Sequence, residues 1–374
     1  MLANDTVKKN QHYLPKFYLR YFSKCENEKE IGVYNINNKK TIRYAPIKSQ
    51  ASKPFYYGRD GVLEDWLSKV EGDFASIIKK LRLTMKPPKR FTNEHLTLLL
   101  FVSCTLARNP MTIEKGLEMM NNVMSTLFSS KEAECYDIPH TDTEDMMRII
   151  MGHISQLTDN ILDLEIKLLV NKTDVPFIAS DNPIVLYNSY LEKKKWPFSK
   201  VGFSVRGLQI FIPISPDLTL TLFDSAIYKI GGRRSSYLNL TAENDILQLN
   251  TLQYLNCIQH IYFSDLFSDK HLHKLLQNSL RFPRANIVQT EVLNLINETH
   301  PSSNRKGILV RSGTSDLSIN LEINGMKYLS GVLSLKLDYS RPSCLRELPE
   351  QLLMERLSRT TNKPFLIYPK GENP

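Results

Sequence analysis

The stretch LQIFIPISPDLTLTLF, from Leu208 to Phe223, contains two apolar runs on either side of a Ser-Pro-Asp turn. Isoleucine, phenylalanine and threonine suit the pleated surface of a strand, and proline and aspartate are typical of tight turns. The pattern predicts two neighbouring antiparallel strands joined by that turn. The rest of the fold can be assigned outward from this pair.

Shorter runs of the same kind flank this pair and extend the predicted sheet. They are PFIAS (176–180), IVLYN (184–188) and AIYKI (226–230), and Asp-Asn-Pro and Gly-Gly turns separate them. Nearer the N-terminus, two β-type runs in 31–47 flank Asn37-Asn38, and asparagine tolerates the positive φ of a hairpin turn. We predict a hairpin there, and a mainly antiparallel sheet from about 175 to 265.

Apolar residues recur at helical spacing in five segments: 62–83, 92–108, 112–129, 143–170 and 242–264. The segment 92–108 is apolar nearly all round, so we expect it to be buried. Towards the C-terminus, the patterns predict strands at 286–296, 307–312 and 317–323 and an amphipathic helix at 346–359.

Together these segments predict an α+β fold. An N-terminal hairpin and a helical bundle (about 62–170) would pack on the mainly antiparallel sheet part (about 175–265). Residues 1–265 would form the core, and 266–374 a C-terminal α/β extension packed on that core.

The composition is that of a globular protein, with 374 residues, of which 42% are hydrophobic and 23% charged. The chain has no apolar run of eighteen residues, and its start MLANDTVKKN lacks the apolar core of a signal peptide. We therefore expect a cytoplasmic protein without a membrane partner. Its five cysteines are scattered and show no zinc-ligand spacing, and the net charge of +9 favours anionic partners such as nucleic acid.

The segment QHYLPKFYLRYF, from Gln11 to Phe22, is the densest group of polar donors in the chain. His12, Lys16 and Arg20 lie here among tyrosines, and Pro15 predicts an extended stretch before it and a helix or turn after it. An imidazole can exchange protons near neutral pH, and a guanidinium can bind a phosphate. The segment therefore suits phosphodiester chemistry, although its aromatic residues would equally serve as core anchors.

Glu71 is predicted to lie on the apolar face of its helix, on the same stripe as Leu67 and Phe74, with Glu64 two turns earlier. A carboxylate directed at a core requires a cation or donor. Arg108 is the expected partner, because it ends the buried helix 92–108 just before Asn109-Pro110. The pair could be purely structural or part of a site.

Asp181 lies in Ser180-Asp181-Asn182-Pro183, between two apolar β runs, where a sheet protein can present a catalytic group or simply make a turn. A nuclease pattern of Asp181 with Glu192-Lys193-Lys194 is weak, because nothing predicts a strand at Glu192. The chain has no Gly-rich phosphate loop, no G-x-S-x-G and no H-E-x-x-H.

Three basic clusters, 86–90, 193–200 and 229–234, could follow a phosphate backbone, although most charge runs are merely solvated. Trp196 or Tyr228 could stack on a base beside two of them.

Several of these segments together resemble the bacterial domain-of-unknown-function family 4238 (DUF4238), whose N-terminal motif is HYxPxFYLRxF. The matching segments are HYLPKFYLRYF, the helix around Glu71, LARNP, FIASDNPIVLYN, FIPISPDLTLTL and LNTLQYLNCIQHIYFS, in that order. They span about Gln11 to Ser264. One departure is Asn109, where the family usually has threonine between the arginine and the proline.

This resemblance implies a stand-alone protein with a link to defence against phage, and it implies no enzymatic mechanism. Eight residues lie in or next to the matching motifs: His12, Arg20, Glu71, Arg108, Asp181, Asn182, Asn250 and Gln253.

From these residues we predict a toxic nuclease that acts on RNA rather than DNA and is released by a phage-encoded trigger. His12, Glu71, Arg108 and Asp181 are the predicted catalytic residues. The predicted substrate-binding residues are Lys16, Tyr18, Arg20, Asn182, Asn250 and Gln253. No cofactor is expected.

Two alternatives stay open. A Mg²⁺-dependent nuclease would use Glu64, Glu71 and Asp181 as metal ligands. A non-catalytic protein that senses a phage component or binds nucleic acid would use the same motifs only to hold its fold. The sequence does not indicate the oligomeric state.

Overall fold

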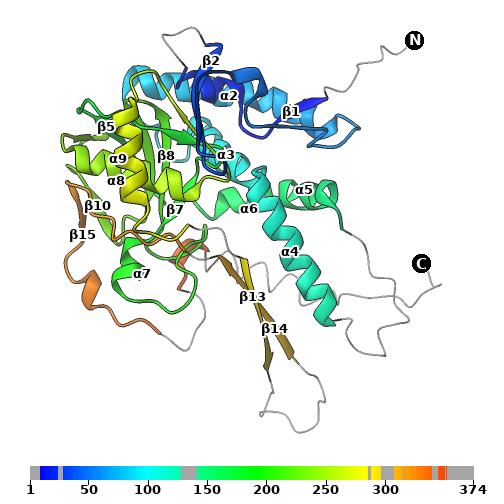
Figure 1. The fold of residues 1–374 in the computed structure, drawn as a ribbon. Coiled ribbons are helices and arrows are strands. Elements are labelled where there is room, and N and C mark those ends of the chain that lie inside the picture. The colour runs from blue at the N-terminus through cyan, green and yellow to red at the C-terminus, as the bar shows by residue number, and fades with distance from the viewer. Residues whose placement is uncertain are drawn as a thin grey trace, which may run out of the picture.

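The structure is a computed structural model, which describes residues 9–23, 28–127, 141–284, 288–295, 307–314, 316–338, 344–349 and 351. The fold is α+β with mainly antiparallel sheets, as predicted (Figure 1). Its centre is the predicted strand pair β8 (Gln209–Ser215) and β9 (Leu218–Phe223), which is antiparallel. This pair lies inside a five-stranded sheet of order β11-β5-β9-β8-β7, completed by β11 (Tyr237–Leu240), β5 (Glu165–Asn171) and β7 (Val185–Tyr187).

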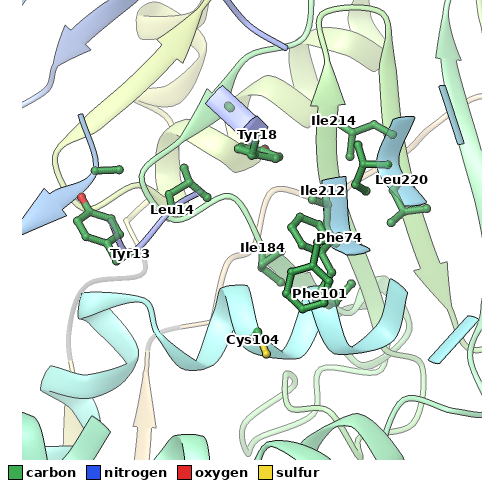
Figure 2. Packing of buried hydrophobic residues seen from close by; sticks show 14 of the residues in the cluster. Tyr13, Leu14, Tyr18, Phe74, Phe101, Cys104, Ile184, Ile212, Ile214 and Leu220 are labelled. Atoms are coloured by element: carbon green, nitrogen blue, oxygen red, sulfur yellow. The ribbon is translucent and has the colours of Figure 1, made fainter. Parts of the chain in front are cut away.

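Both faces of this sheet are covered. Ile210, Ile212 and Ile214 of β8 belong to one hydrophobic cluster, and Phe211 between them belongs to a second. This alternation follows from the two-residue period of a strand. Figure 2 shows the first cluster, where Phe74 and Phe101 from two helices lie against Ile212, with their ring centroids 5.6 Å apart. The second cluster contains residues of helix α8 (Glu243–Asn256).

The helices over the first face come from the N-terminal half of the chain. They are α1 (Lys16–Arg20), α2 (Val62–Thr84), α3 (Asn93–Ala107), α4 (Pro110–Leu127), α5 (Thr143–Gly152) and α6 (Ile154–Asp159). Helix α3 is buried along much of its length, as its uniform apolarity predicts. Thr92 caps its first turn by accepting from the His95 amide, and Arg108 ends it.

The N-terminal hairpin is confirmed as β2 (Glu30–Asn35) and β3 (Lys40–Pro46), within a four-stranded sheet of order β3-β2-β12-β6. The other two strands of that sheet are β12 (His260–Phe263) and β6 (Ala179–Ser180). This second sheet therefore joins segments that lie far apart in the sequence.

The remaining elements are short strands and helices. They are β1 (Asn10–His12) with β4 (Ser52–Pro54), η2 (Ile47–Ser49), α7 (Ser189–Lys193), β10 (Tyr228–Ile230) with β15 (Met326–Tyr328), α9 (Asp269–Ser279), the hairpin β13 (Val288–Leu295) and β14 (Gly307–Thr314), and η4 (Val332–Ser334). In Figure 1 the β13–β14 hairpin points away from the sheets beside α4.

Two predicted helices are wrong in part. The segment 143–170 breaks after Gly152 and again after Asp159, and its last residues form the strand β5. The segment 242–264 is helical only to Asn256, after which β12 begins. In both cases a short apolar run fits either period, and sheet pairing with β9 or β2 decides in favour of a strand.

The predicted strand 317–323 is also wrong, because its backbone bonds to side chains instead of to a neighbouring strand. The amides of Ile319 and Leu321 both donate to the Tyr187 hydroxyl. Most of the predicted helix 346–359 lies outside the described residues. Within that segment, residues 347–349 and 351 are described as helical.

Within the described ranges, no individual helix combines the length and the apolar composition of a membrane span. Helices α3 and α4 meet that test only as a pair, which is bent by 61° at its break.

Candidate functional site

Strand β1 carries the first predicted site residue, His12, and a buried glutamine fixes this strand. The Gln11 side chain is fully buried, accepts from the Tyr57 amide at 2.5 Å and donates to the Gly58 carbonyl at 3.3 Å. The Tyr57 hydroxyl in turn donates to the His12 carbonyl at 2.8 Å. These bonds tie β1 to the loop before α2, so the position of His12 is set by buried contacts.

The His12 imidazole is half-buried, and its Nε2 lies 3.1 Å from the Lys48 carbonyl. A carbonyl can only accept, so Nε2 carries the proton and Nδ1 keeps the lone pair of the neutral ring. Burial, followed by the charge of Lys16, lowers the pKa of His12 from 6.5 to about 4. The imidazole is therefore neutral at physiological pH and can accept a proton at Nδ1.

The predicted partnership of Glu71 with Arg108 is confirmed. Arg108 Nη1 lies 2.7 Å from Glu71 Oε1, and the arginine side chain is fully buried while that of Glu71 is 29% exposed. Arg108 Nε and Nη2 have no hydrogen-bond partner within the part of the chain that the structure describes. Glu71 is the main anionic partner of a buried cation, and it reaches solvent from that position.

Two tyrosines connect this ion pair to strand β1. The Tyr56 hydroxyl donates to the Arg108 carbonyl at 2.9 Å, and the charges of Arg108 and Glu71 both act on the Tyr57 phenol. Arg108 also contributes to the lowered pKa of His12, after burial and Lys16. We call His12, Tyr57, Glu71 and Arg108 the N-terminal cluster. Glu64 lies at its edge, close enough to act on Tyr57.

Asp181 has a different environment. Its side chain is buried, and its carboxylate accepts three backbone N–H bonds, from Ile258 at 2.7 Å and from Gln259 and His260 at 2.8 Å. Burial raises the pKa of Asp181 to about 6, against the three N–H bonds, which lower it. Both oxygens thus serve to hold the turn between α8 and β12.

The neighbouring predicted residues also bind the protein's own backbone. Asn182 donates to the Asn256 carbonyl at 3.1 Å. Asn250 accepts from the Ile178 amide and donates to the Pro176 carbonyl, each at 3.0 Å. Gln253 donates to the Pro183 carbonyl and accepts from the Ser180 hydroxyl, each at 2.9 Å. We call Asp181, Asn182, Asn250 and Gln253 the Asp181 cluster. It fastens the segment 176–183 to α8.

One side chain next to the N-terminal cluster bonds to the backbone of the Asp181 cluster. Asn109, which follows Arg108, donates from its side chain to the Asp181 carbonyl at 2.8 Å. The structure therefore brings the predicted Arg108 and Asp181 motifs together. Among the described residues, however, no hydrogen bond or ion pair joins the Asp181 carboxylate to His12 or Glu71.

Helix α1 presents the remaining predicted residues. Lys16 and Arg20 are exposed, whereas Tyr18 is fully buried and its hydroxyl donates to the Pro213 carbonyl of β8. Tyr18 thus anchors α1 to the central sheet. Trp196 and Tyr228 are 3% and 4% exposed, so neither ring is open to a base.

No three His, Cys, Asp or Glu side chains in the described part of the chain group as metal ligands would. Glu64, Glu71 and Asp181 accordingly form no such group. Glu192, of the weak nuclease pattern, accepts from the Tyr187 hydroxyl at 2.6 Å and from the Asn320 amide at 3.1 Å.

Sequence reasoning missed Gln11, Tyr57 and Asn109 as the residues that hold the two clusters. Gln11 and Asn109 lie next to His12 and Arg108, which was the available signal. Nothing in the loop FYYGRDG, residues 55–61, distinguishes Tyr57 from its aromatic neighbours.

A family model described as "Protein of unknown function (DUF4238)" matches residues 10–266. This range contains every residue of both clusters. No curated protein and no solved structure matches the chain.

Proposed function

Since the chain belongs to the DUF4238 family, whose model covers residues 10–266, we propose that its N-terminal motifs serve the cleavage of RNA in defence against phage. The observation that carries this proposal is the N-terminal cluster. His12 lies there as a neutral imidazole on which the charge of Arg108 acts, and the buried Arg108 pairs with the solvent-reaching carboxylate of Glu71.

In the proposed reaction, His12 Nδ1 removes the proton of an RNA 2′-hydroxyl. The 2′-oxygen then forms a bond to the adjacent phosphorus, and the bond from phosphorus to the 5′-oxygen breaks. Water protonates the leaving oxygen, and the hydroxide so formed takes the proton from the imidazolium, which restores neutral His12. The products are a 2′,3′-cyclic phosphate and a 5′-hydroxyl. A positioned general base contributes about 10²–10⁴-fold to a rate, most when its pKa lies near the operating pH, so a base with a pKa of about 4 belongs at the lower end of that range.

The other residues of the cluster support that step. Lys16 is exposed and its charge acts on His12, so it is the cation best suited to meet the reacting phosphate. Glu71 supplies negative charge that offsets Arg108, whose own charge opposes the imidazolium as it forms. Because the Arg108 side chain is fully buried, we assign it a positioning role towards Glu71 instead of contact with the substrate.

The test is cleavage of a labelled single-stranded RNA by wild-type protein and by His12→Asn, both in EDTA. We expect wild type to yield fragments that end in a cyclic phosphate, and His12→Asn to be at least about 100-fold slower. Equal urea midpoints would establish that the variant is folded. Equal cleavage by the two proteins, or none by wild type, would end this mechanism.

Cleavage that requires Mg²⁺ would contradict the metal-independent mechanism, and its ligands would have to include residues other than Glu64, Glu71 and Asp181, which do not group as metal ligands would. Comparing rates in EDTA with rates in EDTA plus excess Mg²⁺ separates the two mechanisms.

The proposed role in defence rests on the family resemblance. We propose that the activity takes place in the cytoplasm, because phage transcripts are made there. Cells that express wild type should lower phage plating efficiency, while cells that express His12→Asn should not. A phage-encoded trigger would appear as mutations in phages that escape protection.

One observation favours a second candidate function. All four residues of the Asp181 cluster bind the protein's own backbone, as expected of a non-catalytic sensor whose motifs hold its fold. Under that alternative, folded His12→Asn protein would protect cells as well as wild type does.

A further inference from the structure

A cavity of about 600 Å³ opens beside helix α1, and four cationic side chains line it. Its volume lies in the range of ligand sites. The lining residues are Lys16, Arg20, Glu28, Lys29, Glu30, Pro46, Ile47 and Lys48. All four cationic side chains are exposed to solvent.

Three separate segments build this basic groove. Lys16 and Arg20 lie one turn apart on α1, Lys29 comes just before β2, and Lys48 lies in η2. The Ile47 amide donates to the Lys29 carbonyl at 2.8 Å, and the Ile47 side chain is buried. Since α1 also contacts η2, the groove is part of the folded core.

The groove adjoins the N-terminal cluster. The Lys48 carbonyl accepts from His12 Nε2 at 3.1 Å and from the Asn10 side chain at 3.2 Å. The charge of Lys16, which also lines the groove, acts on His12 as well. The groove therefore lies one hydrogen bond from the imidazole, through the backbone of Lys48.

We propose that this groove binds the phosphate backbone of single-stranded RNA and leads it to His12, an inference that rests on the proposed function. Four cations against two carboxylates leave the lining net positive, as a backbone-tracking groove requires. Glu28 would repel phosphate but can accept from a ribose 2′-hydroxyl, the group that distinguishes RNA from DNA.

The test uses Lys29→Glu/Lys48→Glu, which reverses two charges outside the N-terminal cluster. Its matched control is Lys39→Glu/Lys40→Glu, which makes the same charge change at exposed positions of the β2–β3 turn. Both pairs are made in full-length His12→Asn protein so that the RNA stays intact. Urea midpoints establish that each variant is folded.

Binding of a labelled single-stranded RNA is measured by fluorescence anisotropy over a range of salt concentrations. We expect the groove pair to bind at least about 10-fold more weakly at low salt. Its slope of log K against log salt should fall by about 1.4, because each phosphate contact contributes about 0.7 on a single strand. The control pair should keep the slope of its parent.

If the groove pair and the control pair had the same RNA affinity and the same salt dependence, RNA binding by the groove would be contradicted. If single-stranded DNA or an acidic peptide competed as well as RNA, the assignment to RNA would fall. Cleavage assays on the same substitutions with His12 restored separate the two proposals. If the groove binds RNA but wild-type protein does not cleave it, the binding site is supported and the nuclease is contradicted. If the groove pair with His12 restored cleaves as fast as wild type, the nuclease is supported and the groove is contradicted as its RNA-binding site.

Discussion

The N-terminal cluster and the Asp181 cluster each combine one carboxylate with other polar side chains, yet they differ in where their hydrogen bonds go. In the Asp181 cluster the carboxylate accepts three backbone amides, and the amide side chains bind carbonyls and amides of the 176–183 segment and of α8. In the N-terminal cluster His12 keeps a lone pair, Glu71 reaches solvent, and Arg108 has two nitrogens without partners in the described residues.

This difference separates two uses of polar residues. A saturated, buried polar group stabilises one conformation, and its removal leaves orphaned partners. A polar group with capacity to spare can act on another molecule where it reaches solvent, as Glu71 does and the fully buried Arg108 does not. We therefore assign the Asp181 cluster to the fold and the N-terminal cluster to the proposed chemistry.

The largest expected effect is on stability, from Asp181→Ala. This variant leaves three backbone N–H groups without an acceptor. We therefore expect the free energy of unfolding, measured by urea titration, to fall by about 3 kcal/mol or more. The control is Asp73→Ala, an exposed carboxylate on α2, which should change stability by less than about 0.5 kcal/mol. Similar small losses for both variants would contradict the structural assignment.

The next effect concerns the buried cation. Glu71→Ala leaves Arg108 without its carboxylate, and we expect a loss of about 2–3 kcal/mol, with less for Glu71→Gln, which keeps an acceptor. The comparison is Glu94→Ala, which removes an exposed ion pair with Lys80 and should cost less than about 1 kcal/mol. If the two alanine variants were equally mild, Glu71 would not be needed to balance Arg108.

The smallest expected effect is on pH dependence. Because the pKa of His12 is about 4 in the folded chain, wild-type RNA cleavage should stay flat from pH 8 to about 5 and fall by half near pH 4. A fall centred near 6.5, the ordinary value, would show that His12 is not held neutral.

The lowered pKa of His12 also predicts how the stability of the folded protein depends on pH. A histidine whose folded pKa is lowered contributes stability that is present above its unfolded pKa of 6.5 and is lost as the pH falls towards 4. Urea midpoints of wild type should therefore fall more steeply between pH 6.5 and 4 than those of His12→Asn. Parallel curves would argue against the lowered pKa.

The sequence predicted the fold class, the central strand pair, the hairpin and the Glu71–Arg108 pair, because each has a local signal. The apolar stripe on α2 and the proline after Arg108 are enough to bring that pair together. Strand β5 was read as helix, since residues 165–171 become a strand only by pairing with β9 and β11. These pairing partners lie about 50 to 70 residues away in the sequence, so no local pattern predicts them.

The division between the two clusters was likewise invisible in the sequence. Asp181 and Glu71 both read as carboxylates near a core, and only the structure shows which one is saturated by backbone amides. The sequence indicated only part of the groove. Lys16 and Arg20 belong to the predicted N-terminal motif, whereas Lys29 and Lys48 are brought beside them by folding, where the Ile47 amide of η2 donates to the Lys29 carbonyl.

The most direct test measures unfolding free energy and RNA cleavage on the same two variants, His12→Asn and Gln253→Ala. We expect His12→Asn to lose at least about 100-fold in cleavage with less than about 1 kcal/mol in stability. Gln253→Ala should lose about 2 kcal/mol but cleave within about threefold of wild type while folded. The account is contradicted if His12→Asn cleaves as wild type does, or if folded Gln253→Ala is inactive.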